Sequence, residues 1–252
     1  MTLNAVRREQ ILDILNESYE VRVVRLARQL QVSEMTIRRD LKVLEEEGVL
    51  RRVHGGAVTA APVTVPSMST RTPLRDAEKA AIGRLAATLV EPKTQVFIGG
   101  SSTTFHLSRA LARGPQAAYA TNSIIAAQEL ASGHQRDIRV FGGMLRAEVG
   151  TLIGEEVIQS VEQRIFDFAF IGILAIDPKF GFLDPTEWHV HLKRTVRRRA
   201  RQVVVVADHS KFSARGEFCS FKFEEVDILV TDCAPSPENA ALLEESGVRI
   251  LY

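Results

Sequence analysis

The chain has 252 residues, which is enough for one large domain or for a small domain followed by a medium-sized one. Hydrophobic residues make up 45% of the chain and charged residues 25%, which is typical of a soluble globular protein rather than of a disordered one. The formal net charge is only +1, so any field that attracts nucleic acid must be local.

No targeting or membrane segment is visible. The first ten residues lack the apolar core of a signal peptide. The longest apolar-rich stretch, 165–176, is interrupted by Asp167 and is shorter than the roughly 20 residues that span a bilayer. The spacing of the two cysteines, Cys219 and Cys233, matches no metal site or redox motif. We therefore expect a cytoplasmic protein with reduced structural thiols, no metal, no cofactor and no membrane partner.

Three helical patterns precede residue 48, at residues 6–16, 23–30 and 34–47. Ser33 is a suitable N-cap for the third helix, and Glu34 follows in the first turn, where the helix dipole favours a negative charge. The apolar stripe of this helix consists of Ile37, Leu41 and Leu44. Its opposite face carries Met35, Arg39, Lys42 and Glu46, with Arg38 on the flank. One apolar stripe and a basic outer face suit a helix that reads the major groove of DNA.

Residues 49–58 predict a strand, a glycine-rich turn and a second short strand, which is the pattern of a wing. Gly48 is placed to end the helix before it. The side chains expected beside a DNA backbone are Arg51, Arg52 and His54. Between residues 22 and 52, eight basic side chains stand against five acidic ones, a modest local excess. Composition alone leaves two roles open, because winged helices bind DNA and also serve as protein-interaction modules.

Two segments carry a family resemblance: VSEMTIRRDL at residues 32–41 and LRRVHGGA at residues 50–57. Together they resemble the helix-turn-helix signature of the DeoR family of bacterial transcriptional regulators. The resemblance implies that this part of the chain binds a double-stranded DNA operator. The residues that we expect to contact DNA are Ser33, Met35, Thr36, Arg38, Arg39, Lys42, Arg51, Arg52 and His54.

A linker is predicted after the wing. Residues 57–73 are rich in Ala, Thr, Val, Ser and Pro and carry no helical or alternating pattern. We therefore divide the chain into a small α+β winged helix-turn-helix domain at 1–58, a linker at 59–73, and an α/β effector-sensing and oligomerisation domain at 74–252.

In this second domain, apolar strand-like runs alternate with helical patterns. The continuous run at 203–206 is typical of a strand that is buried on both faces, which predicts a mainly parallel sheet covered by helices. The predicted strands are 95–98, 117–121, 138–141, 166–175, 203–207, 227–231 and 249–251. The predicted helices are 76–90, 103–113, 123–132, 155–164, 187–201 and 237–246.

Ligands of such sheets gather beyond the carboxyl ends of the strands, and four polar loops are expected there. The glycines and hydroxyls from Gly99 to Thr104 suit an anion, or a turn with an N-cap. Asn122 can bond a ligand or cap a helix, and the glycines at 142–143 permit a tight turn or a close ligand approach. Asp208 and Lys211 can hold sugar hydroxyls and a phosphate, or act as an N-cap and a solvated cation.

The same loops, in the same order, resemble those of the effector domain of DeoR-family regulators. The resemblance implies a fold related to sugar-phosphate isomerases and CoA transferases, and an effector that is a phosphorylated sugar or a derivative of one. It assigns effector binding to Gly99, Gly100, Ser101, Ser102, Thr103, Thr104, Asn122, Gly142, Gly143, Glu187, Lys193, Asp208 and Lys211. One departure matters: Gly99 stands where the family usually has an Asp, so recognition of a sugar hydroxyl by that carboxylate cannot be carried over.

Six basic residues fall between 193 and 201. On a helical wheel one face carries Arg194, Arg197, Arg198 and Arg201. We interpret this face as the solvated side of a helix that covers the sheet; a second contact with DNA or with an acidic partner subunit stays open.

The function that these observations favour is a repressor of carbohydrate metabolism genes that binds its operator as a dimer or higher oligomer and responds to a phosphorylated sugar. The alternative is a sugar-phosphate isomerase-like enzyme fused to a winged helix, with Lys211 holding phosphate. Its general base would come from Asp177, Asp184, Glu187 and Asp208. No pair of carboxylates has a spacing that compels acid/base chemistry. A third possibility is a structural scaffold that uses the winged helix for protein contacts.

Overall fold

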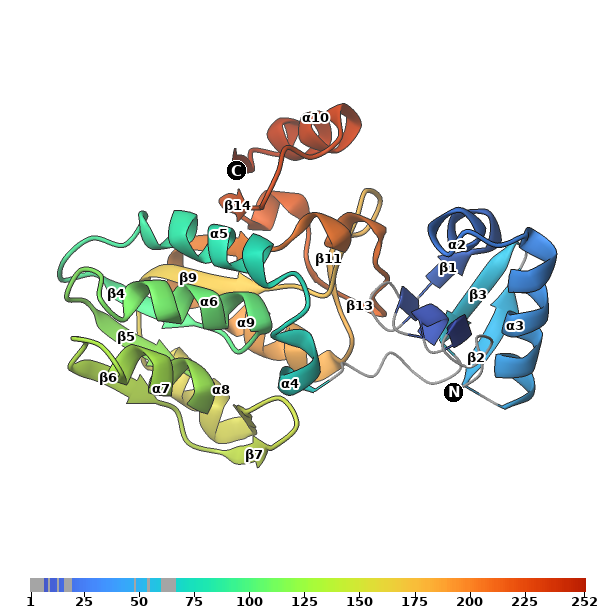
Figure 1. The fold of residues 1–252 in the computed structure, drawn as a ribbon. Coiled ribbons are helices and arrows are strands. Elements are labelled where there is room, and N and C mark those ends of the chain that lie inside the picture. Colours follow the sequence, from blue (N-terminus) through green and yellow to red (C-terminus); the bar gives the residue numbers. More distant parts are fainter. Residues whose placement is uncertain are drawn as a thin grey trace.

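The computed structural model describes residues 7, 8, 10–12, 14, 15, 20–47, 49–53, 55–59 and 67–252. Its elements form an N-terminal unit that ends at Thr59 and a larger unit that begins at Ser67. In Figure 1 the N-terminal unit is blue, and the larger unit runs from teal to red. Within these ranges no helix is both long enough and apolar enough to cross a membrane.

The N-terminal unit contains three helical segments and a small sheet. The described residues from 7 to 15 are helical, and two further helices follow, α2 (Val23–Gln29) and α3 (Glu34–Glu46). The sheet has the antiparallel order β1-β3-β2, with β1 at Glu20–Arg22, β2 at Leu50–Val53 and β3 at Gly56–Thr59. The predicted helices and wing are confirmed where the structure describes them; Gly48 and His54 lie outside the described residues.

Burial explains this arrangement. The apolar stripe of α3 packs with Ile11, Leu15 and Leu26 in one core, and all of its three predicted members are at most 2% exposed. The predicted N-cap is also confirmed, because Ser33 Oγ accepts a hydrogen bond from the Thr36 amide at 3.2 Å. Strand β1 was not predicted, since three residues are too short to show alternation.

The predicted linker is wrong for part of its length. Residues 68–71 form the short helix α4 (Met68–Arg71), with Ser67 as its N-cap. Met68 is 7% exposed, and its amide donates to the Glu148 carbonyl at 2.8 Å. A single helical turn gives no periodic signal in the sequence, and the prolines on either side suggested irregular structure instead.

The larger unit is built on seven parallel strands in the order β15-β14-β12-β9-β4-β5-β6. They are β4 (Gln95–Ile98), β5 (Ala118–Thr121), β6 (Asp137–Val140), β9 (Phe166–Gly172), β12 (Ala200–Val206), β14 (Ile228–Val230) and β15 (Arg249–Leu251). The predicted parallel sheet is thereby confirmed, and each of its seven strands overlaps a predicted one.

Helices cover both faces of this sheet, as Figure 1 shows. One face packs against α5 (Asp76–Ala87), α6 (Ser102–Leu111) and α7 (Ile124–Ala131), and the other against α8 (Glu155–Glu162), α9 (Glu187–Arg199) and α10 (Pro237–Glu245). Val204 and Val206 of β12 point to the first face, and Val203 and Val205 point to the second. All four are at most 1% exposed, which explains the continuous apolar run in the sequence.

Helix α9 ends two residues earlier than predicted, and this changes the arginine-rich face. Ala200 and Arg201 are already extended and belong to β12, so Arg201 does not share the helical face of Arg194 and Arg198. Instead, Arg201 Nε lies 3.3 Å from a carboxylate oxygen of Asp167. Arg194 and Arg198 are exposed, in agreement with a solvated helix surface.

Short elements that the sequence did not predict lie beyond the carboxyl ends of the parallel strands. They are the hairpin of β7 (Met144–Arg146) and β8 (Thr151–Ile153), the antiparallel strands β10 (Ala175–Asp177), β11 (Gly181–Asp184) and β13 (Phe218–Phe221), and the 3₁₀ turn η1 (His209–Ser213). A second 3₁₀ turn, η2 (Phe223–Glu225), directly precedes β14. The predicted strand 166–175 is therefore two strands, β9 and the start of β10.

Candidate functional site

The outer face of α3 carries the side chains that were predicted to read DNA. Met35 is 74% exposed, and Arg39 is exposed with no hydrogen bond or ion pair to any described residue. A terminal nitrogen of Arg38 lies 3.4 Å from a carboxylate oxygen of Glu34, and Lys42 Nζ lies 3.8 Å from a carboxylate oxygen of Glu46. Exposed pairs of this kind contribute only a few tenths of a kcal/mol, about 0.3–0.5, so DNA phosphates can displace them. The surface can therefore present three cations to a groove.

The wing is less basic than its sequence indicates. Arg52 Nε lies 2.6 Å from a carboxylate oxygen of Glu45, and the Arg52 amide donates to the other oxygen at 2.8 Å. These bonds from the backbone and the side chain of Arg52 hold the pKa of Glu45 below its usual value. Arg52 thus joins β2 to α3 and is partly neutralised. Of Arg51 the structure gives the backbone, paired with Val58.

Helix α2 adds basic side chains that were not predicted as DNA contacts. Arg22, Arg25 and Arg28 line one shallow depression together with Val24 and Gln29. Arg25 and Arg28 are exposed and form no ion pair with any described residue. The sequence already indicated these two residues, because arginines three residues apart in a helix lie on one face. Arg22 is the last residue of β1.

A buried ion pair joins α3 to the first helix. Asp40 is 5% exposed and accepts from Arg7 Nε at 2.6 Å and from a terminal Arg7 nitrogen at 3.2 Å. The hydrogen bond to Asp40 raises the pKa of Arg7. This bidentate contact joins the first helix to α3, so it orients the reading helix without touching DNA.

A cleft opens in the larger unit at the carboxyl ends of β4, β5 and β9, on the side of the sheet that α9 covers. Its lining consists of Phe97, Gly99, Gly100, Asn122, Thr151, Ile171, Gly172, Trp188, His189, Leu192 and Lys193. Predicted site residues among these are Gly99, Gly100, Asn122 and Lys193. Strand β8 and the first turns of α9 supply the wall that the sequence did not predict.

Glycines bring the backbone segments of this cleft close together. A Cβ at Gly100 would lie 2.1 Å from the Thr151 methyl group, and one at Gly172 would lie 2.2 Å from Ser101 Oγ. At Gly99, by contrast, a Cβ would meet nothing closer than 3.6 Å, so this position has room for a side chain. The absent carboxylate at Gly99 is therefore a chemical difference and not a steric requirement.

The hydroxyls of the first loop are largely committed to the protein itself. Ser101 Oγ accepts from the Thr104 amide at 3.0 Å, and Thr104 Oγ1 accepts from the Ser101 amide at 2.9 Å. Thr104 Oγ1 also donates to the Gly99 carbonyl. Ser102 and Thr103 are at most 7% exposed. The loop thus offers a ligand its glycine backbone and the start of α6 more than its hydroxyls.

Lys193 lies at the floor of the cleft in a buried ion pair. Its Nζ donates to Asp184 at 2.6 Å and to the Gly172 carbonyl at 2.7 Å. Ser220 Oγ donates to the same Asp184 oxygen at 2.5 Å. Burial lowers the pKa of Lys193, and the Asp184 charge opposes that effect. Ser220 was not predicted here, and Asp184 was predicted only as a candidate base of the enzyme alternative; they come from β13 and β11, far apart in the sequence.

His189 lines the same cleft, and its pKa is lowered. Burial is the main cause, and with smaller contributions from the charges of Lys193, Arg71 and Arg146 it lowers the pKa of His189 to about 4 against the opposing charge of Asp184. Its Nδ1 lies 2.7 Å from Thr186 Oγ1. Three cations thus act on the imidazole together with Asp184, and an anionic ligand in the cleft would be attracted by these cations.

Asn122 offers the cleft an unused acceptor. It is 3% exposed, and its Nδ2 donates to the Leu152 carbonyl at 3.1 Å. Its Oδ1 is buried and has no hydrogen-bond partner in the structure. A buried polar atom without a partner costs free energy, about 1–3 kcal/mol, which a donor on a ligand would recover.

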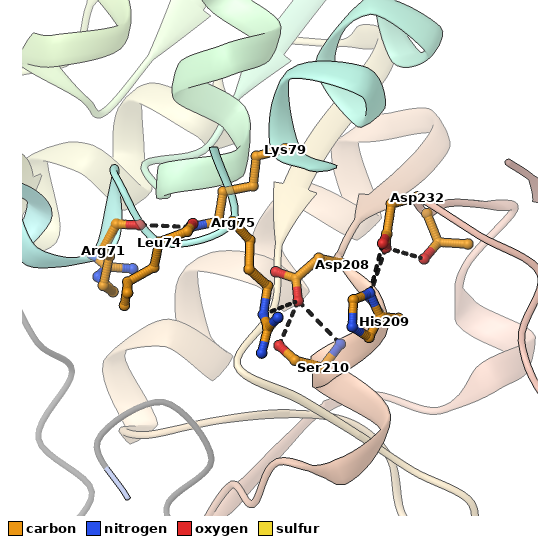
Figure 2. A network of polar contacts seen from close by, with 9 residues as sticks. Arg71, Leu74, Arg75, Lys79, Asp208, His209, Ser210 and Asp232 are labelled. Carbon is orange, nitrogen blue, oxygen red and sulfur yellow. Dashed lines mark hydrogen bonds and ion pairs between the residues drawn. The ribbon is translucent and has the colours of Figure 1, made fainter. Parts of the chain in front are cut away.

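Asp208 and Lys211 are not in this cleft. Asp208 is 1% exposed, caps η1 through Ser210, and lies 3.5 Å from Arg75 (Figure 2). Burial raises the pKa of Asp208, but the Lys211 charge and the bonds from Ser210 outweigh this and hold it below its usual value. Nearby, Lys79 donates to the carbonyls of Arg71 and Leu74, and burial lowers its pKa to about 8.

Three further predicted residues also lie outside the cleft. Gly142 and Gly143 are exposed at the turn into β7, and Gly143 has a φ of +127°, which favours glycine. Glu187 is exposed in the first turn of α9. The structure therefore brings together only part of the predicted set and adds Thr151, Trp188 and His189, whose sequence context carries no motif.

Comparisons with known proteins match two parts of the chain. Residues 7–63 match the model of the DeoR-like helix-turn-helix domain, and residues 75–233 match that of the DeoR C terminal sensor domain. The chain is 33% identical to the HTH-type transcriptional repressor GlcR of Bacillus subtilis, over 96% of this chain and 93% of that one. It is 31% identical to the glycerol-3-phosphate regulon repressor of Haemophilus influenzae, over 92% and 90%. Among solved structures, ribose 5-phosphate isomerase A of Neisseria gonorrhoeae aligns with a TM-score of 0.39 at 18% identity, over 54% and 53% of the two chains.

Proposed function

The chain belongs to the DeoR family of transcriptional regulators, and on that premise we propose that it represses genes of carbohydrate metabolism and responds to a phosphorylated sugar. The N-terminal unit binds the operator through α3, with Arg39 toward base edges and α2 toward phosphates. The phosphorylated effector binds in the cleft between β4, β5, β9 and α9 and changes the affinity for DNA.

Two features support the choice of ligand: three cations act on His189 in the cleft, and the cleft holds an unused acceptor. Lys193, Arg71 and Arg146 all act on His189, and Asn122 Oδ1 has no partner. An anion is favoured by the first feature, and a hydroxyl donor by the second. A phosphorylated sugar carries both groups on one small molecule. The relatives named as repressors of GlcR type and of a glycerol-3-phosphate regulon support this class.

Helix α4 supplies a physical connection between the cleft and the DNA-binding unit. Arg71 belongs to α4, its charge reaches His189, and its carbonyl accepts from Lys79 at 2.6 Å (Figure 2). Met68, at the other end of α4, is held by the Glu148 carbonyl in the turn between β7 and β8. An anion that draws Arg71 toward the cleft therefore moves the segment that follows the linker. For this effect the ligand must bind the state that releases DNA more tightly than the state that holds DNA, by about 1–3 kcal/mol.

The enzyme alternative has less support. Asp184 is locked between Lys193 and Ser220, and Asp208 caps η1, so neither is a free general base. Asp177 accepts from the amides of Lys179 and Phe180 at an exposed turn, outside the cleft. We propose that the cleft binds its ligand without turning it over.

Self-association is proposed at the outer edge of β6. This strand ends the parallel sheet, and no described strand pairs with its outer edge. Val140, Met144 and Leu145 are 43%, 62% and 46% exposed beside it. Antiparallel pairing with a second copy, centred on residue 138, sets Asp137 opposite Arg139 on both sides of the two-fold axis. Arg139→Asp should lower the dimer fraction in sedimentation experiments, and adding Asp137→Arg should restore it; no effect of either change would remove this interface.

The experiment that tests the proposed function uses full-length protein and an operator selected from a random DNA pool. A thermal-shift panel of sugars, each with and without phosphate, identifies the ligand, because a bound ligand stabilises by RT ln(1 + [L]/Kd). The best ligand is then added to the protein–DNA complex. We expect a phosphorylated sugar to shift the melting temperature and to release DNA. Turnover of that sugar, or DNA affinity that no stabilising ligand changes, would contradict the proposal.

A further inference from the structure

Three side chains with metal-binding atoms meet where β12 and β14 end. His209 opens η1, and Asp232 and Cys233 follow β14. One imidazole nitrogen, one carboxylate oxygen and the Cys233 sulfur all lie within 4.8 Å of one another. None of the three lines the cleft described above. The cluster is therefore separate from the effector site.

Two of the ligands are already oriented by the protein. His209 Nδ1 lies 2.6 Å from one oxygen of Asp232, and the His209 amide donates to the other oxygen at 2.7 Å (Figure 2). The Asp232 side chain is only 8% exposed, whereas the His209 side chain is 46% exposed. The carboxylate is thus fixed and the imidazole lies over it, with one side open to solvent. Cys233 is exposed, so its side chain can turn toward the pair.

The chemistry of the three groups selects the ion. Imidazole, thiolate and carboxylate together are ligands of Zn²⁺ and of its neighbours Co²⁺ and Ni²⁺, whereas Mg²⁺ and Ca²⁺ prefer oxygen alone. Bonds of about 2.0–2.3 Å to a tetrahedral ion place the ligand atoms roughly 3.3–3.7 Å apart. In the structure the shortest distance between two of these ligand atoms is 2.6 Å, and all of them lie within 4.8 Å of one another. Side-chain movements of about 1 Å would therefore bring them to the spacing of a tetrahedral site.

We propose that His209, Asp232 and Cys233 form a binding site for a Zn²⁺-class transition metal ion. Water completes the coordination on the open side. On binding, the thiol proton of Cys233 passes to solvent, and the imidazole of His209 binds in its neutral form with its proton on the ring nitrogen that does not contact the ion. The ion would join η1 to the segment after β14, next to the Asp208 cluster. This site could not be predicted from the sequence, because its ligands come from segments 23 residues apart and only one of the two cysteines belongs to it.

The test uses untagged full-length protein titrated with CoCl₂ and followed by absorbance. A thiolate-to-cobalt charge-transfer band should grow and saturate at one ion per chain; ZnCl₂ should abolish it, and MgCl₂ should not. Cys233→Ser should remove the band, and Cys219→Ser, which changes the other cysteine, should keep it. His209→Gln and Asp232→Asn should each weaken binding at least about tenfold, since loss of even an outer contact costs that much.

Circular dichroism of each variant checks that the fold is intact. Cys233 and His209 are exposed, so their substitution should leave the spectrum unchanged. A wild-type protein that gives no thiolate band at saturating CoCl₂ overturns the proposal. A band that survives Cys233→Ser, or binding that His209→Gln and Asp232→Asn both leave unchanged, overturns it equally.

Discussion

His189 makes a quantitative prediction, because its imidazole is neutral in the folded protein far below its usual range. Burial and the nearby cations lower its pKa from 6.5 to about 4. Below pH 6.5 the unfolded chain takes up a proton at this residue while the folded chain does not. Stability from this group is thus complete above pH 6.5 and is lost as the pH falls toward 4.

The size of this loss of stability follows from the pH range between the two pKa values, 6.5 in the unfolded chain and about 4 in the folded one. Each pH unit below 6.5 costs up to about 1.4 kcal/mol, so the loss between pH 7 and pH 5 is about 2 kcal/mol at most. The imidazole keeps some contact with solvent, which reduces the expected loss to about 1–2 kcal/mol. Urea unfolding at a series of pH values measures it.

The matched comparison is between two histidines of α9. His189→Gln should flatten the dependence of the unfolding free energy on pH, whereas His191→Gln, at an exposed position two residues later, should leave it as in the wild type. Identical pH slopes for the wild type and His189→Gln would contradict the lowered pKa of His189.

Three further changes test other parts of the account. Arg39→Ala should weaken binding to the selected operator by about 1–3 kcal/mol and binding to random DNA only slightly. Arg25→Ala should weaken binding to both DNAs equally and lower the slope of log K against log salt concentration by about one unit. Fluorescence anisotropy measures both effects, and equal losses on the two DNAs for Arg39→Ala would refute its base-reading role. Asp40→Ala removes the buried carboxylate that accepts two hydrogen bonds from Arg7 and should destabilise the N-terminal unit by about 2–3 kcal/mol, seen as faster hydrogen exchange in residues 20–47; unchanged protection would show that the pair does not hold α3. Gly99→Asp places a side chain where a Cβ meets nothing closer than 3.6 Å. In titration calorimetry it should change which sugars bind, while phosphorylated sugars still bind better than unphosphorylated ones. Loss of the preference for phosphate with unchanged sugar selectivity would show that Gly99 does not contact the sugar.

The parallel sheet could be predicted from the sequence because its strands are buried on both faces. The run at Val203–Val206 has no polar break, and the reading helix has one apolar stripe and a capping Ser33. Short elements were missed for the opposite reason. Strand β1, helix α4 and the strands around β11 have three or four residues each, and tertiary contacts rather than local pattern determine them.

The effector site was predicted in part, and side-chain alternation explains the error. Phe97 and Ala120 point to the face that α9 covers, so Gly99 and Asn122, two residues on, lie on that side. Val206 points to the opposite face, and Asp208, two residues on, lies 3.5 Å from Arg75, the N-cap residue of α5. The sequence placed all of these loops at one edge of the sheet but did not say which helix layer covers which face.

The central claim is that a phosphorylated sugar binds in the cleft that Lys193 lines, where the charge of Arg146 acts on His189. Its most direct test is titration calorimetry of the best sugar, with and without its phosphate, against wild type, Arg146→Gln and Lys211→Gln. We predict that the wild type binds only the phosphorylated form well, that Arg146→Gln weakens this binding about tenfold, and that Lys211→Gln leaves it unchanged. Equal binding of both forms by the wild type, or a loss confined to Lys211→Gln, would contradict the account.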